Sequence, residues 1–151
     1  MKSSIVVAGL AVAMASASGA VLAQAKPDVL VKQRQAGMTM IGKYFGPLGG
    51  MAQGRVPYNA EVVVRNAGYL EVLGKLPWDG FDASTANEKS AALPAVYKDA
   101  AKFKQAADDM QGAIAKLAST AKGGDEAAVK AAIGAVGKSC GGCHDNFREK
   151  K

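Results

Sequence analysis

The sequence has little of the side-chain chemistry that most metal sites and active sites need. It contains two cysteines and one histidine among 151 residues, and all three stand in the run from Cys140 to His144. A structural zinc site normally takes four protein ligands, so these residues do not favour one. No Ser/His/Asp set or pair of carboxylates indicates a catalytic centre. We therefore expect a protein that is not an enzyme.

Other missing features narrow the class of protein further. Lys and Arg number 19 against 13 Asp and Glu, a formal net charge of +6, but no run of basic residues occurs, which argues against a nucleic-acid partner. There is no alternating strand pattern and no internal repeat. With 49% hydrophobic residues, a chain of this length is enough for one domain with a real core and too short for two.

The first apolar run has the layout of an export signal. Lys2 supplies positive charge, residues 5–14 are apolar, and a stretch of small residues ends at Ala23. The apolar run is too short to span a bilayer, and no second one follows. We expect residues 1–23 to be a cleaved signal peptide and residues 24–151 to be a periplasmic domain without membrane insertion. A buried first helix or a retained anchor is the alternative.

Apolar residues then recur at alternating spacings of three and four in four stretches, which predicts four amphipathic helices. The first begins at Pro27 and should end at residues 46–50, which are rich in Gly and Pro. The inward-facing residues expected of the first helix are Val31, Arg34, Met38, Ile41, Phe45 and Leu48, and those of the second are Val62, Asn66, Tyr69, Leu73 and Leu76. Those of the third are Val96, Ala100, Phe103, Ala107, Met110, Ile114, Leu117 and Ala121, and those of the fourth are Val129, Ile133, Val136, Cys140, Cys143 and Phe147.

The residues between these stretches predict how the helices are joined. Asn59 and Asp125 are the expected N-caps of the second and fourth helices, and Pro94 opens the third. Residues 78–93 form the longest connection, which should cross one end of the molecule with its aromatic residues as packing anchors, namely Trp78 and Phe81. The predicted fold is all-α, an antiparallel up-down-up-down four-helix bundle.

Cys140-Gly141-Gly142-Cys143-His144 is a C-x-x-C-H run, the attachment signature of c-type haem. Two thiols add to the haem vinyl groups as thioethers, and the adjacent imidazole ligates the iron. Spacings of three and four place all three side chains on one helix face. A redox disulfide is the alternative, but such a motif belongs at the start of a helix that follows a strand. We predict one covalently bound haem c per chain.

Arg34 is a full charge at a position where the helical pattern expects a core residue. A guanidinium near a core needs an anion, and a haem propionate would serve. The alternative is that the aliphatic part of the side chain lies along the core and the charge reaches water.

Over its whole predicted mature length the chain resembles the cytochrome c′ family, a well-known example of the up-down-up-down bundle. The matching residues are Lys26-Pro27, Arg34-Gln35, Met38, Leu76-Pro77-Trp78, Phe81, and the haem motif followed by Arg148. The resemblance implies attachment through Cys140 and Cys143 and places His144 as the single protein ligand of the iron.

The resemblance also implies roles around the haem. Arg34 and Gln35 match residues that meet the haem propionates. Met38 matches the distal position, where a side chain lies over the iron without bonding it. Arg148 matches a basic residue beside the proximal face.

The function implied by the resemblance is a homodimeric protein with five-coordinate, high-spin iron that binds nitric oxide and carbon monoxide but not oxygen. A role in electron transfer with an unidentified redox partner stays open. The alternative is a six-coordinate His/Met electron-transfer cytochrome of the c556 type, in which Met38 or Met40 would be the sixth ligand. The Arg34-Gln35 pair just before Met38 favours the open position.

Overall fold

The computed structural model describes residues 25–123 and 125–150. Its elements are α1 (Pro27–Ala52), α2 (Ala60–Leu73), the 3-10 helices η1 (Trp78–Phe81) and η2 (Ala83–Thr85), α3 (Ala95–Lys98), α4 (Ala100–Ala121) and α5 (Glu126–Phe147). The expected signal peptide, residues 1–23, lies outside the described residues. Within those residues no helix is long and apolar enough to cross a membrane.

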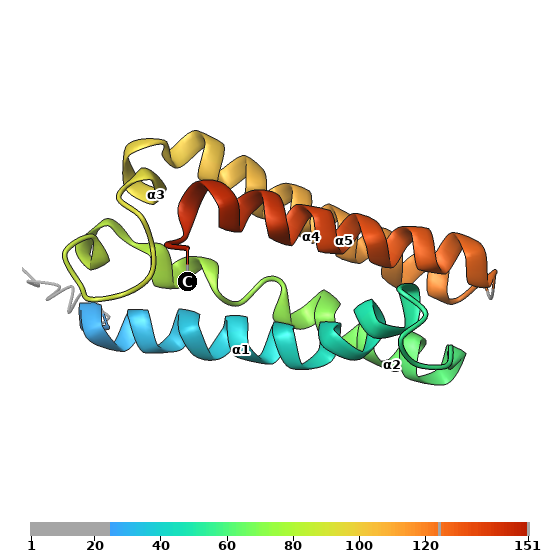
Figure 1. Ribbon diagram of the computed structural model, residues 1–151. Coiled ribbons are helices and arrows are strands. Elements are labelled where there is room, and N and C mark those ends of the chain that lie inside the picture. The colour runs from blue at the N-terminus through green and yellow to red at the C-terminus, as the bar shows by residue number, and fades with distance from the viewer. Residues whose placement is uncertain (1–24, 124, 151) are drawn as a thin grey trace, which may run out of the picture.

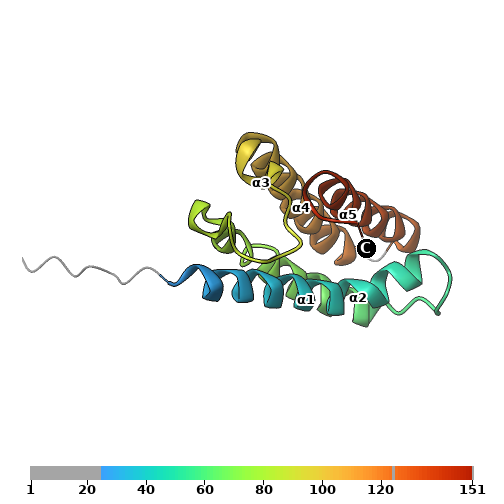
Figure 2. The same ribbon diagram turned by 60° about the vertical axis from the view of Figure 1, so that its left-hand side comes forward.

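The four long helices α1, α2, α4 and α5 form the predicted antiparallel bundle (Figure 1). Successive long helices run in opposite directions, with α1 and α2 on one side and α4 and α5 on the other, an arrangement that the turned view of Figure 2 also shows. The connection from α2 to α4 lies at the end of the bundle where α5 finishes, as the sequence predicted. Among the described residues the only β-bridge joins this connection at Ala92 to Arg148.

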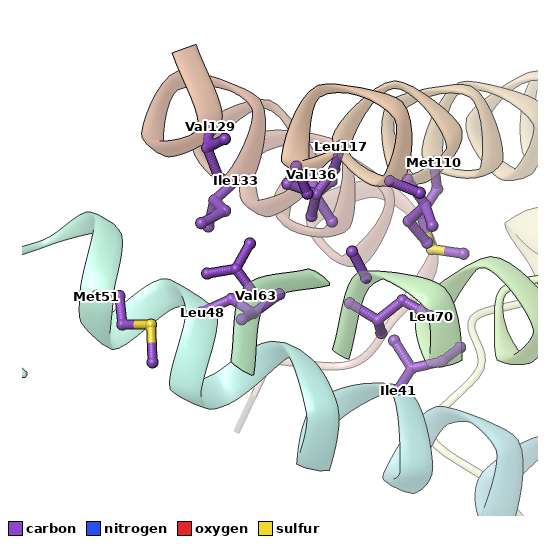
Figure 3. Packing of buried hydrophobic residues seen from close by; sticks show 14 residues of the cluster. Ile41, Leu48, Met51, Val63, Leu70, Met110, Leu117, Val129, Ile133 and Val136 are labelled. Atoms are coloured by element: carbon purple, nitrogen blue, oxygen red, sulfur yellow. The ribbon is translucent and has the colours of Figure 1, made fainter. Parts of the chain in front are cut away.

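The hydrophobic core lies between the two helix pairs. In Figure 3 the side chains of α1 and α2 point toward those of α4 and α5. Five of the larger side chains are completely buried: Leu48, Val63, Leu70, Leu117 and Val129. Burying a side chain of this size stabilises the fold by about 1.5–3 kcal/mol. This packing therefore fixes how the helices are rotated about their axes.

α1 continues through residues 46–50, where the sequence pattern predicted its end. Pro47 lies inside the helix, although an interior proline costs about 3 kcal/mol. The neighbouring Leu48 and Met51 are 0% and 6% exposed, so their burial offsets that cost. The chain turns only after the helix, at Gly54, whose φ of 70° is a conformation that glycine adopts without strain.

The predicted inward face of α2 is only partly correct, because Asn66 is buried and Val62 and Leu73 pack against the core, but the helix is rotated away from Tyr69. Of the predicted inward residues, Tyr69 and Leu76 are exposed. The residues that α2 buries are Val63, Asn66, Ala67 and Leu70. This short helix has apolar side chains around most of its circumference. Apolar spacings of three and four are therefore compatible with two orientations of the helix about its axis. Packing against α1 and α4 selects between them.

Helix starts follow the predicted capping chemistry at two junctions. The Asn59 side chain accepts a hydrogen bond from the Val62 N–H at 3.0 Å, and Asp125 accepts from the Ala127 N–H at 3.0 Å.

The third predicted helix, which opens at Pro94, is interrupted in the structure. Asp99 has φ −111° and ψ 46° and separates α3 from α4. The break leaves the Tyr97 hydroxyl hydrogen-bonded to side chains of α1 and η2.

Leu70→Ala should lower the free energy of unfolding by about 2–5 kcal/mol, because the side chain is completely buried. Leu76→Ala is the matched control, since Leu76 is 58% exposed and should change stability by less than about 0.5 kcal/mol. Urea unfolding of dilute protein measures both. Equal losses, or a larger loss at Leu76, would show that the burial of Leu70 and the exposure of Leu76 described above are wrong.

Candidate haem site

The last turns of α5 carry two thiols and one imidazole on one helix face. Cys140, Cys143 and His144 are each half-buried, and the helix runs unbroken through Gly141 and Gly142 between them. Upstream on the same face, α5 packs its apolar side chains into the core. The donors of the motif therefore lie on the half-buried side of α5, in line with its core-facing residues.

The surroundings of these groups change their protonation. Burial lowers the pKa of the His144 imidazole below its ordinary value, and the neighbouring Arg148 guanidinium lowers that pKa further, while Asp145 acts in the opposite direction. A neutral imidazole offers a free nitrogen lone pair to a metal. Burial raises the pKa of the thiols of Cys140 and Cys143, so the thiol form predominates at neutral pH.

α1 forms the facing wall of this region. Figure 1 shows the last half of α5 lying over the middle of α1. Met38 and Phe45 of α1 and Cys140 of α5 are partly buried against the same hydrophobic cluster. A Cβ added to Gly137 would stand 3.5 Å from Cζ of Phe45, so the two helices are in contact one turn before Cys140.

Four aromatic rings gather at the end of the bundle where α5 finishes: Trp78, Phe81, Phe103 and Phe147. The Phe81 and Phe103 centroids are 4.8 Å apart, and those of Phe103 and Phe147 are 5.3 Å apart. The indole N–H of Trp78 donates to the Gly74 carbonyl at 2.7 Å. These contacts pack the rings of Trp78 and Phe81 against neighbouring elements, as predicted for anchors of the connection.

Arg34 is buried at the start of the bundle, with only 3% of its surface exposed. This excludes the alternative in which its charge reaches water. Its guanidinium donates to the Gly80 carbonyl, Thr85 Oγ1, Tyr97 Oη and Ser90 Oγ at 2.7, 2.9, 3.1 and 2.8 Å. No carboxylate of the described residues forms an ion pair with it. Sequence reasoning found the buried charge but missed these four partners, because turn residues carry no periodic signal.

The remaining predicted site residues lie in different environments. Gln35 is exposed although its neighbour Arg34 is buried, and Met40 is 37% exposed although Met38 is half-buried. Arg148 follows the last turn of α5 in an extended conformation, and its N–H donates to the His144 carbonyl at 3.1 Å. The structure thus brings Arg148 next to His144 in sequence and backbone hydrogen bonding, while Arg148, Gln35 and Met40 are all exposed.

The donor set fits c-type haem. Two thiols at the right spacing can form thioethers, a neutral imidazole beside the second thiol can ligate iron, and a half-buried, largely apolar setting suits a flat hydrophobic macrocycle. Among the described residues no group of three or more His, Cys, Asp and Glu side chains forms a separate metal site. His144 is the one imidazole of the sequence and is therefore the candidate nitrogen donor to iron.

Comparison with known proteins agrees with this chemistry. Residues 29–148 match the family model described as cytochrome c′. The chain belongs to the cytochrome c′ family. It is 43% identical to cytochrome c′ of Rubrivivax gelatinosus, over 83% of this chain and 98% of the relative, and 40% identical to cytochrome c′ of Alcaligenes xylosoxydans xylosoxydans, over 84% and 98%.

Solved cytochrome c′ structures share the fold as well. The crystal structure of the Rubrivivax gelatinosus protein superposes with a TM-score of 0.78 at 42% identity, covering 82% of this chain and 98% of that one. Two variants of the Alcaligenes xylosoxidans protein, one with nitric oxide and one with carbon monoxide bound, each superpose with a TM-score of 0.77 at 40% identity, over 83% of this chain and 98% of theirs. Cytochromes c′ carry covalent haem c, and Cys140 and Cys143 are the attachment residues of this chain.

Proposed function

We propose that this cytochrome c′ family member binds nitric oxide and carbon monoxide at an open axial position of its haem. The observation that carries the proposal is the asymmetry of the site. α5 offers one nitrogen donor, His144, whereas Met38 of α1, which is partly buried against the same hydrophobic cluster as Cys140, offers only a thioether. Relatives with nitric oxide and carbon monoxide bound support the same reading and do not favour the six-coordinate alternative.

Each predicted residue has a distinct part in this proposal. The thioether bonds at Cys140 and Cys143 hold the cofactor, which when bound supplies an iron centre with affinity for diatomic gases. His144 stays unprotonated and keeps its lone pair because burial and Arg148 lower its pKa. Met38 covers the opposite side as a non-bonding side chain.

Discrimination between gases follows from the chemistry of Met38. Hydrogen-bond donors and steric access on the distal side decide whether a haem protein takes up oxygen. A thioether has no donor, so it gives oxygen no support, whereas nitric oxide and carbon monoxide depend less on such support. The side chain also restricts space for every ligand that enters on this side.

Arg34 and Gln35 remain the proposed partners of the haem propionates. Support comes from Arg34, a buried cation with neutral hydrogen-bond acceptors and no carboxylate partner among the described residues. A propionate would supply the anion that such a group favours. For Gln35 the support is its position in the sequence alone, since its side chain is exposed.

Met38→Ala should leave the spectrum of the oxidised haem protein nearly unchanged and speed carbon monoxide binding by about one to two orders of magnitude. The reason is that removing a side chain that crowds the ligand relieves about 1–3 kcal/mol. Flash photolysis and absorption spectroscopy measure the two effects.

Met40→Ala is the matched control, because Met40 is on the same helix but 37% exposed, and it should change neither property. A change from a low-spin to a high-spin spectrum in Met38→Ala would instead identify Met38 as the sixth ligand. Thermal unfolding must accompany the measurement, since the substitution also leaves a cavity.

We also propose a homodimer formed through α1 and α2. All of the large hydrophobic residues that are exposed in the described chain come from α1, α2 and the turns that follow them: Val29, Met40, Val56, Val64, Tyr69, Val72 and Leu76. α4 and α5 contribute none. Singly exposed apolar residues are normal, but their restriction to one helix pair favours a second copy covering that side.

Val64→Lys should shift a wild-type dimer toward monomer, because it would bury an unpaired charge in the contact. Ala131→Lys is the control, since Ala131 is exposed on α5, and this variant should remain dimeric. Sedimentation velocity over a range of concentrations measures both. A wild-type protein that is monomeric throughout, or a control that dissociates equally, would contradict this contact.

The export of the chain is part of the same proposal. Residues 1–23 would be removed as a signal peptide, and the domain from residue 24 would act in the periplasm, where covalent haem attachment takes place in bacteria. The match to the family model starts at residue 29 and therefore leaves this leading segment outside the shared domain.

A further inference from the structure

The guanidinium of Arg34 holds both halves of the connection that closes one end of the bundle. In the first half, the Gly80 carbonyl and Thr85 Oγ1 accept from Nη1, at 2.7 and 2.9 Å. In the second half, Ser90 Oγ accepts from Nη2 at 2.8 Å. The guanidinium also lies 4.5 Å from the ring centroid of Phe81. A buried cation is tolerated only while such acceptors remain in place, so Arg34 fixes this connection relative to α1.

The backbone at Gly80 shows how closely the first half lies against α1. A Cβ at this position would stand 2.6 Å from Cβ of Arg34 and 2.7 Å from the carbonyl oxygen of Leu30. No other residue fits there without moving the chain. The first half is thus anchored to α1 by close packing as well as by hydrogen bonds, whereas Ser90 is the residue through which Arg34 holds the second half.

The second half in turn holds the end of α5. Residues 90–93 pair with the chain that leaves the helix: the Glu149 N–H donates to the Ala91 carbonyl at 2.9 Å, and the Leu93 N–H donates to the Phe147 carbonyl at 2.9 Å. These two hydrogen bonds flank the β-bridge described above. The residue between them in the sequence is Arg148, next to the imidazole that the chain offers to iron.

On the basis of the proposed function, we infer that Arg34 is a positioning residue for the proximal side of the haem site. Through Ser90 it fixes residues 90–93, which fix the end of α5 and thereby the orientation of His144 and the place of Arg148. These contacts start at Arg34, which lies on α1 one turn before Met38. A side chain of the helix that carries Met38 thus controls the geometry around His144 on α5.

The test is Ser90→Ala in the haem-loaded protein. This change removes one acceptor of Arg34 and leaves its other contacts, so folding is retained. Hydrogen exchange at the Leu93 and Glu149 amides should become about tenfold faster, as expected for loss of one hydrogen bond to a charged group. The iron–histidine stretching band of the reduced protein, recorded by resonance Raman spectroscopy, should shift or broaden.

Thr85→Val is the matched control. It also removes one acceptor of Arg34, together with the hydrogen bonds of the Thr85 hydroxyl to the Asp82 carbonyl and Tyr97 Oη. It keeps the shape of the side chain, but Thr85 lies in the first half of the connection. This variant should leave both readouts unchanged. Equal effects of the two variants on the amides and the band, or no effect of Ser90→Ala on either, would overturn the inference.

The same experiment separates this inference from the proposed function. If the wild-type protein shows no iron–histidine band, ligation by His144 fails. In that case the Leu93 and Glu149 amides still decide whether Arg34 controls the end of α5. A normal wild-type band that Ser90→Ala does not alter leaves the proposed function intact and overturns the inference alone.

Discussion

The rest of the structure depends on one face of α5, which both packs into the core and carries the haem motif. Its upstream residues, Val129, Ile133 and Val136, pack into the core, and Cys140 and His144 continue the same stripe toward the helix end. The packing that fixes the rotation of α5 therefore also fixes where the donors of the haem motif point. Burial has a chemical consequence as well, because it keeps the imidazole neutral and available for iron.

A second constraint comes from placing a guanidinium in the interior. Burying a charge without partners is unfavourable. Four neutral acceptors and the face of the Phe81 ring stabilise the Arg34 guanidinium in the interior. The cluster around Arg34 ties together α1, η2, α3 and the strand-like segment beside the end of α5. The end of the bundle where α5 finishes is consequently closed by these polar contacts together with the aromatic cluster described above, while the opposite end is closed by apolar packing around Leu48 and Val129.

The sequence alone predicts the parts of this structure that have local signals. The haem motif, the caps at Asn59 and Asp125 and the antiparallel bundle each follow from spacing or capping chemistry, and the structure agrees. The length of α1 could not be predicted, because burial of Leu48 and Met51 outweighs the local penalty of Pro47. The rotation of α2 and the partners of Arg34 are set by tertiary contacts that leave no periodic pattern.

The central claim is that the iron has one protein ligand, His144, and an open position on the side of Met38. Absorption spectra of the purified wild-type protein in both oxidation states test it most directly. We expect high-spin bands in the oxidised and reduced protein and rapid spectral change when nitric oxide or carbon monoxide is added. Low-spin spectra in both states, with a charge-transfer band typical of iron bonded to a methionine sulfur, would contradict the account.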